Sequence, residues 1–490
     1  MDAGAAASGA TAVVVGGGIS GLLAARELAR AGVHTTVLEA SGAWGGCVGS
    51  HTVAGLSLDS GAESFATRSS AVADLAAELG LAADIVPPNP GGAWVQLPDG
   101  PRELPKTGVL GIPANPWDPE VRRSLGLLGS VRAWMDALLP ASLGTTADAT
   151  SVSALVRARM GRRVLDRLVA PVVGGVHSAD PGLLDVDMVA PGLRAGIRQH
   201  GSLAAAVAAQ RRGGAPHKTG LRTPAPQKPG SAVAGLRGGM HTLVTALVAD
   251  LRRRGVTLLA TTPAEAVERT AQGWRVTSGK AAYDAGLLVV AVDGPAAVGL
   301  LQDTLPELAA RRPAAGPDVG LVTLVVDLPE LDAAPRGTGV LVAPQSSGIQ
   351  AKALTHATAK WAWLAARTGP GTHVLRLSYG RGEDPQPDAR RPARGAAEPR
   401  SDAELFQAAL KDASALLAVP VASGDVVGWD VVRWAGALPF ASLGHKRRIA
   451  EVRNICAADG SLAVVGGWLA GNGLAAIVAD TPQQVRTLLA

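Results

Sequence analysis

The chain has 490 residues, of which 47% are hydrophobic and 18% charged, with a formal net charge of +5 and a pI near 9.5. This length predicts two or three domains with sizeable cores. The modest positive charge suits an acidic small molecule or an anionic membrane face better than nucleic acid. Only Cys47 and Cys456 are present, which argues against a disulfide framework or a thiol-bound metal and indicates a reducing, cytoplasmic compartment. No run of 18 uncharged apolar residues occurs, so we expect no membrane-spanning helix.

The segment 11–40, TAVVVGGGISGLLAARELARAGVHTTVLEA, predicts a strand, a glycine turn, a helix and a second strand that ends at Glu39. Gly16 permits the turn, Gly18 lets the backbone approach a pyrophosphate, and Gly21 lets the helix pack close to the strand. The helix N-terminus would face the phosphates, and Glu39, 18 residues after Gly21, is placed to bond a ribose. The pattern therefore predicts a dinucleotide site, and its alternative is a glycine turn without a ligand.

Two further glycine segments favour FAD over NAD. Gly45-Gly46 is followed by Leu58-Asp-Ser-Gly-Ala-Glu-Ser-Phe65, a second turn that would bring backbone close to a flavin. Near the C-terminus, an apolar strand enters Gly466-Gly467 and then Gly471-Asn-Gly473-Leu474. A long cofactor lying across the fold requires such a late return to the first domain, whereas the alternative is an ordinary strand–helix unit.

The order of predicted elements indicates the α/β class (α+β overall), with a discontinuous FAD-binding domain. We expect that domain at 1–92, 232–310 and 424–490, a helical domain at 93–210, a flexible loop at 211–231, and a mixed-sheet substrate domain at 311–423 with an exposed insertion at 382–401. Hydrophobic periodicity predicts amphipathic helical pieces at 119–139 and 151–169, a helix at 243–254, strands near 256, 274 and 287–292, and antiparallel strands at 319–326 and 373–379. The predicted loop is basic between Arg211 and Lys228 but lacks interleaved aromatic residues. A solvated loop is therefore favoured over a nucleic-acid site there.

Several separated segments share one pattern: Gly16 to Gly21, Gly61-Ala-Glu-Ser-Phe65, Leu104-Pro105 with Gly111-Ile-Pro113, Arg167 to Val176, Gly238-Gly-Met240, Lys352-Ala-Leu-Thr355 with Lys360-Trp361, Arg433-Trp434 and Gly444-His445. Together they cover almost the whole chain, and they resemble the FAD-dependent protoporphyrinogen/coproporphyrinogen oxidase family of the amine-oxidase-like flavoproteins. The resemblance implies a Rossmann-like, p-hydroxybenzoate-hydroxylase-like FAD domain, a substrate domain and a helical domain that can contact membranes. It is consistent with a cytoplasmic protein, and peripheral contact with the membrane is left open.

Three positions depart from the family pattern. Ala43-Trp44 stands where a basic residue usually precedes Gly45-Gly46, which removes one expected phosphate contact. Pro439-Phe440-Ala441 stands in place of Pro-Gln-Tyr, and Asp293 in place of a common proline. We interpret these as tolerated variation.

The resemblance also implies the site residues. The implied FAD contacts are Gly16, Gly17, Gly18, Ile19, Ser20, Gly21, Glu39, Ala40, Gly45, Gly46, Gly61, Ala62, Glu63, Ser64, Val267, Trp434, Asn472, Gly473 and Leu474. For Val267 and Trp434 the alternative is core packing. Arg68 is a candidate for binding a substrate propionate through two hydrogen bonds, against the alternative of a surface arginine. His177 is a candidate proton acceptor, against the alternative of a structural histidine. No metal and no catalytic acid or base is assigned, because the flavin carries the chemistry.

The implied activity is oxidation of coproporphyrinogen III to coproporphyrin III in heme biosynthesis. Hydride transfer from a meso carbon to flavin N5, repeated three times, would remove six electrons, using three O2 and yielding three H2O2. Protoporphyrinogen IX, with two propionates instead of four, is the alternative substrate. A flavin amine oxidase or desaturase is a weaker rival, because an aromatic cage at the flavin would have to use Trp when Tyr283 and Tyr379 are the only tyrosines. A non-enzymatic, FAD-containing tetrapyrrole-binding protein is a further alternative, and the oligomeric state is left open.

Overall fold

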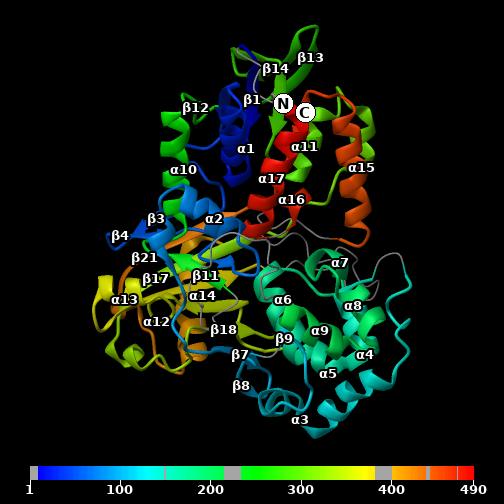
Figure 1. Ribbon diagram of the computed structural model, residues 1–490. Helices are drawn as coiled ribbons and strands as arrows, with labels where there is room; N and C mark the ends of the chain where they lie inside the picture. Colours follow the sequence, from blue (N-terminus) through cyan, green and yellow to red (C-terminus); the bar gives the residue numbers. More distant parts are fainter. Residues whose placement is uncertain are drawn as a thin grey trace.

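The structure is a computed structural model that describes residues 9–106, 108–147, 150–213, 233–380, 400–436, 442–471 and 473–490. Most of the predicted loop at 211–231 and of the predicted insertion at 382–401 lies outside these residues, as do Asn472 and residues 439–441. Figure 1 shows an α/β body around β1 (Thr11–Val15) at the top, a mixed sheet at lower left and a group of helices at lower right.

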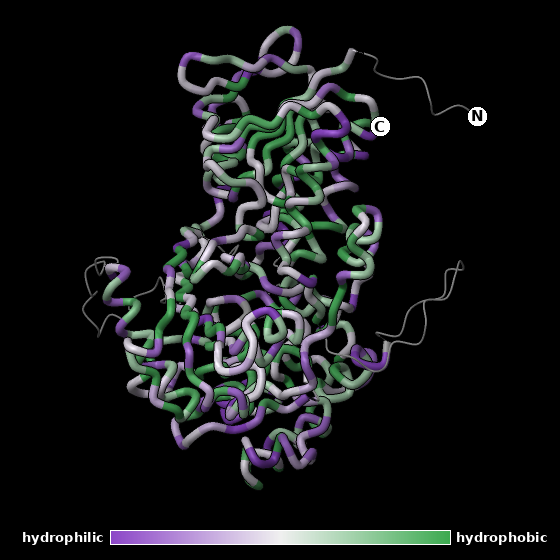
Figure 2. The backbone as a smooth tube through the Cα atoms, turned by 90° about the vertical axis from the view of Figure 1, so that its left-hand side faces the viewer, coloured by the Kyte–Doolittle hydropathy of each residue, from purple (hydrophilic) through white to green (hydrophobic). Residues whose placement is uncertain are grey.

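A five-stranded parallel sheet forms the centre of the upper body, in the order β12, β2, β1, β16, β22. Its other strands are β12 (Thr257–Leu259), β2 (His34–Leu38), β16 (Leu287–Val290) and β22 (Leu462–Val464). Ala12 and Val14 face one hydrophobic core, whereas Val13 and Val15 face another. Because both faces are covered, the strands are apolar almost throughout, which gives the hydrophobic band in the upper part of Figure 2.

Helices and a small meander cover the two faces of this sheet. On one side lie α1 (Ile19–Arg30), α10 (His241–Arg253), α17 (Leu474–Leu489) and α2 (Ala71–Glu78). On the other lie α11 (Gly294–Leu301), α15 (His445–Ala457), and the antiparallel strands β13 (Ala266–Thr270), β14 (Gly273–Ser278) and β15 (Ala281–Ala285). The sheet thus joins strands from the beginning, the middle and the end of the described chain.

A seven-stranded mixed sheet forms the second body, in the order β21, β17, β20, β19, β18, β7, β8. Its strands are β21 (Val426–Trp434), β17 (Val319–Asp327), β20 (Thr372–Tyr379), β19 (Ala353–His356), β18 (Gly339–Val342), β7 (Ala93–Leu97) and β8 (Gly100–Glu103). Only β18 and β7 pair in parallel; every other neighbouring pair is antiparallel. The helix α14 (Asp402–Leu417) packs on one face, and α12 (Ala357–Lys360) and α13 (Ala362–Thr368) pack on the other.

The third body is helical and has its own core. It contains α3 (Pro119–Trp134), α4 (Val152–Met160), α5 (Arg162–Val164), α6 (Ala170–His177), α7 (Val186–Val189), α8 (Leu193–His200) and α9 (Leu203–Gly213), with the short helices η2 (Met135–Leu138) and η3 (Leu165–Val169) and the strands β9 (Gly108–Val109) and β10 (Ile112–Pro113). None of the helices in the described ranges is long and apolar enough to cross a bilayer.

The remaining elements are short and lie within or between these bodies. They are β3 (Ser50–Val53), β4 (Leu56–Asp59), β5 (Phe65–Ala66), η1 (Ala82–Asp84), β6 (Ile85–Val86), β11 (Val233–Leu236), η4 (Pro306–Arg311), η5 (Pro329–Ala333), η6 (Ser423–Asp425) and α16 (Gly467–Ala470). β3 pairs with β4, and β11 lies between β5 and β6. β3 also contacts β17 and β21, so the β3–β4 hairpin packs on the mixed sheet.

The strand pairing corrects the expected domain boundaries. Residues 93–103, assigned from the sequence to the helical domain, form the edge of the mixed sheet, because β7 pairs with β18. Residues 426–434, assigned to the last FAD segment, pair with β17 in the same sheet. The amphipathic piece expected at 151–169 is broken at Gly161, whose φ of +89° ends α4.

Candidate functional site

The first glycine turn lies where β1 passes into α1. Gly16 has a φ of +103°, and a Cβ there would meet the carbonyl oxygen of Ala291 at 2.8 Å. A Cβ on Gly21 would stand 1.8 Å from the Gly16 carbonyl oxygen, so the helix packs directly on the turn. Gly18, in contrast, has no atom within 4 Å of its would-be Cβ. The turn is therefore closed on the side of the strand and open at Gly18.

Glu39 reaches this turn from the end of β2. Its Oε2 accepts a hydrogen bond from the Gly17 N–H at 2.6 Å, and its Oε1 accepts one from the Ser41 N–H at 2.8 Å. Trp44 lies beside Glu39 against Gly17, where its ring is 2.5 Å and the Glu39 Cβ 2.9 Å from a would-be Cβ. The residue that replaces the family's basic side chain thus packs against the turn.

The second glycine turn lies beside the first. The Gly45 N–H donates to the Gly17 carbonyl at 2.8 Å, and the Ala62 N–H donates to the Cys47 carbonyl at 2.8 Å. A Cβ on Gly61 would lie 2.1 Å from that same Cys47 oxygen. The segment around Cys47 therefore joins the two turns that the sequence analysis assigned to one cofactor.

Donors from the mixed sheet fix the backbone of the second turn. The Trp434 indole N–H, at the end of β21, donates to the Ser60 carbonyl at 2.8 Å. Arg376, on β20, donates to the Gly61 carbonyl at 2.8 Å and to the Asp59 carbonyl at 3.3 Å. Two strands far along the chain thus hold a turn of the first body.

Glu63 completes this contact between the two bodies. Its carboxylate pairs with Lys360 and, at 3.1 Å, with Arg376, and its side chain is 15% exposed. Burial alone would raise the pKa of Glu63, but the charges of Lys360 and Arg376 outweigh burial and lower that pKa to about 2. The carboxylate is therefore ionised at every pH at which the protein is expected to work.

The C-terminal return reaches the same region. After β22, the Val465 N–H donates to the Val290 carbonyl at 3.0 Å, and Gly466 has a φ of +137°. Gly473, with a φ of +115° and open space at its would-be Cβ, precedes α17, which begins at Leu474 and packs on α1. The implied contact at Asn472 lies outside the described residues.

These features fit a dinucleotide cofactor. The Gly18 position that caps α1 offers no side-chain partner, so the first N–H groups of that helix are left for a ligand anion. The space at Gly18 admits a pyrophosphate, and Glu39 lies at the edge of the turn, where a ribose hydroxyl would meet it. The residues in this part of the chain therefore suit FAD.

The remaining candidates do not gather at one point. Val267 is 5% exposed and packs in the core beside Trp274, so its flavin contact stays a prediction. Arg68 is exposed just after β5, and no interaction is recorded for it among the described residues. His177 ends α6 at 7% exposure, and burial lowers its pKa to about 4. A neutral imidazole of that pKa is a weak proton acceptor at pH 7.

Sequence reasoning missed the role of two cations. Arg376 was not singled out, and Lys360 was quoted only as part of a family motif. Each pairs with Glu63 across about 300 positions of sequence. The local signal for such a pair was Glu63 itself, an acidic residue inside an otherwise apolar glycine turn. A buried carboxylate needs a cationic partner, so its presence there predicts one.

Comparisons with known proteins agree with this geometry. The chain matches the family model described as flavin containing amine oxidoreductase over residues 19–479. It is 30% identical to a coproporphyrinogen III oxidase of Mycobacterium leprae (strain TN), over 97% of this chain and 98% of the relative. It is 29% identical to a coproporphyrinogen III oxidase of Propionibacterium freudenreichii subsp. freudenreichii, over 96% of this chain and 88% of the relative.

A solved structure is similar along the whole chain. The crystal structure of a protein from Exiguobacterium sp. 255-15, described as a candidate protoporphyrinogen oxidase, superposes with a TM-score of 0.79 at 25% sequence identity. The similarity covers 98% of this chain and 99% of that one. The arrangement of parallel sheet, mixed sheet and helical body is therefore shared.

Proposed function

Because this chain belongs to the flavin containing amine oxidoreductases, and within them to the FAD-dependent protoporphyrinogen/coproporphyrinogen oxidase family, we propose that it oxidises coproporphyrinogen III to coproporphyrin III. It is an oxidoreductase, and FAD is its cofactor. The observation that carries the substrate proposal is the match of 97% of this chain to a relative named for coproporphyrinogen III.

When bound, FAD supplies the two-electron acceptor. The residues of the chain would position it: the open turn at Gly18 would receive the pyrophosphate, and Glu39 would accept hydrogen bonds from the ribose. Arg376 and Trp434 fix the backbone of the second turn, so its N–H and C=O groups keep one orientation toward the cofactor. We assign no proton step to His177, because its imidazole is neutral and weakly basic.

The overall reaction balances as three two-electron oxidations. Together the three steps remove six hydrogens, one from each of the four meso carbons and one from each of two pyrrole nitrogens. Three of them leave as hydrides from meso carbons and three as protons, and each pair of electrons passes to O2 to give H2O2. Three O2 are consumed and three H2O2 formed for each porphyrin. The substrate's propionates require cationic partners at the protein, and Arg68 is our candidate for one of them.

The test is anaerobic mixing of the FAD-loaded protein with coproporphyrinogen III and, in parallel, with protoporphyrinogen IX and an alkyl amine. We expect the flavin absorbance to bleach faster with coproporphyrinogen III, and porphyrin fluorescence and H2O2 to appear when O2 is admitted. Faster bleaching by protoporphyrinogen IX would overturn the substrate while keeping the class. Bleaching by the amine alone, or by none of the three, would overturn the proposal.

A pair of variants tests the propionate contact. We expect Arg68→Gln to raise KM for coproporphyrinogen III by on the order of tenfold while kcat changes little, because a charged hydrogen bond to the bound substrate is lost. Arg237→Gln is the matched control, since Arg237 follows the paired strand β11 and its side chain is 63% exposed. Equal KM values for the two variants would leave Arg68 as an ordinary surface arginine.

A further inference from the structure

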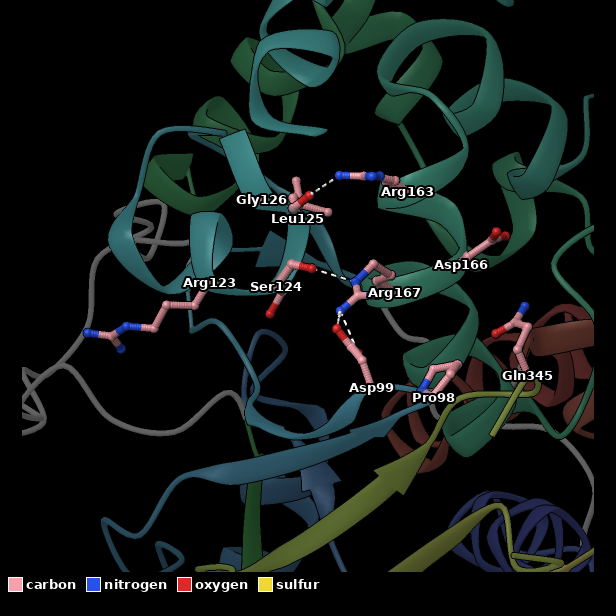
Figure 3. Close-up of a pocket in the computed structure, with 10 residues that line it drawn as sticks. All are labelled: Pro98, Asp99, Arg123, Ser124, Leu125, Gly126, Arg163, Asp166, Arg167 and Gln345. Carbon is pink, nitrogen blue, oxygen red and sulfur yellow. Dashed lines mark hydrogen bonds and ion pairs between the residues drawn. The ribbon is translucent and has the colours of Figure 1, made fainter. Parts of the chain in front are cut away.

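A cavity of about 410 Å³ lies where the mixed sheet meets the helical body. The turn between β7 and β8 and the segment after β18 form one side of it, and α3, α5 and η3 form the other. Figure 3 draws its ten lining residues, none of which belongs to either glycine turn. Sites for small molecules commonly lie between two bodies of a protein and measure roughly 300–1,000 Å³. The cavity is therefore large enough for a small organic ligand.

Polar groups dominate the lining of this cavity. Seven of the ten residues are charged or carry a side-chain hydroxyl or amide, and the other three are Pro98, Leu125 and Gly126. Sites for apolar ligands are lined mainly by hydrophobic and aromatic side chains instead. A tetrapyrrole, with its wide apolar ring, would not match these walls. A ligand of this cavity is therefore hydrophilic over most of its surface.

A break in α3 fixes two arginines in the cavity wall. Gly126 has a φ of 70° inside α3, a conformation outside the helical region that glycine adopts without strain. Beside this break, the Ser124 carbonyl accepts a hydrogen bond from Arg167, and the Leu125 carbonyl accepts one from Arg163 at 3.0 Å. The two arginines are four positions apart, so both guanidinium groups are held near the break.

The two acidic residues of the lining are already neutralised. Arg167 donates to both carboxylate oxygens of Asp99 at 2.7 Å, and these hydrogen bonds lower the pKa of Asp99. Asp166 accepts a hydrogen bond at 2.9 Å from Arg162, which is not part of the lining. Neither carboxylate therefore offsets the charge of the remaining arginines.

Arg163 and Arg123 keep their charges for a ligand. Among the described residues neither has a recorded carboxylate partner, and the Leu125 carbonyl is the single recorded acceptor of Arg163. Because a guanidinium group has five N–H donors, most of them remain available. Figure 3 shows Arg163 reaching toward Leu125 and Gly126, and Arg123 extending away from the other labelled side chains. The cavity thus has one uncompensated positive charge at the break and another at its rim.

Ser124 adds a hydroxyl group to the same wall. Its side chain lines the cavity and is only 2% exposed, yet its oxygen has no hydrogen-bond partner in the described protein. Buried hydroxyl groups normally have a partner, because leaving one without a partner costs free energy. Rotation of this side chain would let the hydroxyl donate to an oxygen of a ligand in the cavity.

We propose that this cavity binds a small, water-soluble organic dianion, a phosphate monoester or a dicarboxylate, through Arg163, Arg123 and Ser124. A phosphate monoester carries about 1.5 to 2 negative charges near neutral pH, which matches the two uncompensated arginines. Guanidinium groups bind carboxylate and phosphate alike through paired hydrogen bonds. The bound molecule would contact both the mixed sheet and the helical body. The inference goes beyond the proposed oxidation, because it assigns a site outside the cofactor region.

The test is isothermal titration calorimetry of the FAD-loaded protein at neutral pH and constant ionic strength. The probes are glycerol 3-phosphate, which is a phosphate monoester, and succinate, which is a dicarboxylate. We expect at least one of them to bind with a Kd of about 1 mM or below, and the tighter one identifies the preferred group. The methyl ester of glycerol 3-phosphate carries one negative charge fewer and should bind at least about tenfold more weakly.

Variants of the lining assign the binding to this cavity. Arg163→Gln should weaken binding of the better probe by on the order of 10- to 100-fold, because charged hydrogen bonds are lost. Ser124→Ala should weaken it by about threefold to tenfold and leave the melting temperature unchanged, because this hydroxyl has no partner in the described protein. Arg122→Gln is the matched control: Arg122 is exposed beside Arg123 but does not line the cavity. Its loss should change the Kd by less than about twofold.

Three outcomes would overturn the proposal: no binding of either dianion, equal affinity for the methyl ester, or equal losses in Arg122→Gln and Arg163→Gln. Melting temperatures without ligand show whether each variant folds, and Ser124→Ala keeps the test decisive if Arg163→Gln does not. Bleaching of the flavin by coproporphyrinogen III is a separate readout. Failure of this site and failure of the proposed oxidation are therefore distinguishable.

Discussion

Glu63 offers the sharpest quantitative test of the contact between the two sheets. Its pKa is lowered from the ordinary 4.5 to about 2, which corresponds to about 3 kcal/mol of interaction that favours the ionised form. The unfolded chain binds this proton at a higher pH than the folded chain does. The stabilisation is therefore complete above pH 4.5 and is lost as the pH falls toward 2. Linkage gives a loss of about 2 kcal/mol by pH 3.

The variant Glu63→Gln keeps the shape and removes the charge. We expect it to be about 3 kcal/mol less stable than the wild type at pH 7, and we expect the difference to shrink to about 1 kcal/mol at pH 3. Denaturant unfolding followed by tryptophan fluorescence at both pH values measures this difference. Glu451→Gln is the control, because Glu451 forms an exposed pair with Arg311 at 3.1 Å and should contribute less than about 1 kcal/mol. A difference between wild type and Glu63→Gln that is independent of pH would refute the reasoning.

Three further predictions concern other parts of the chain. Gly21→Ala should weaken FAD binding more than about tenfold, because the added Cβ would stand 1.8 Å from the Gly16 carbonyl oxygen. The ratio of flavin to protein absorbance in the purified variant measures the bound FAD, and full retention of FAD would contradict this prediction. The pKa of buried His177 falls from 6.5 to about 4, so folding stability should drop by about 3 kcal/mol as the pH falls from 6.5 to 4. His177→Gln should lack that drop in denaturant unfolding, and an unchanged drop would count against it. Asp136→Ala removes the carboxylate that pairs at 2.6 Å with the fully buried Arg159 and leaves that charge with backbone carbonyl acceptors alone. We expect a cost of about 3–5 kcal/mol in the same assay, and a loss under about 1 kcal/mol would speak against it.

The local parts of the cofactor region could be predicted from the sequence. The spacing of Gly16, Gly18, Gly21 and Glu39 lies within one strand–turn–helix–strand unit, and the structure brings these residues together at one turn. Hydrophobic periodicity likewise predicted the helix at 243–254, which the structure has at His241–Arg253. Such features involve residues within about 25 positions of one another in the sequence. Their separation in space is therefore set by the local strand, turn and helix that they form.

Only the tertiary structure decided which distant segments meet. The pairing of Lys360 and Arg376 with Glu63, and the place of residues 426–434 in the mixed sheet, depend on strand order, which no local pattern encodes. The sequence also predicted an amphipathic piece at 119–139 without indicating that its large apolar face points outward. Which face of a helix is buried depends on what packs against it, and here Gly129 and Ser130 provide the close contact while Leu128 stays exposed. Periodicity determines that a helix has two faces, and packing determines which of them meets solvent.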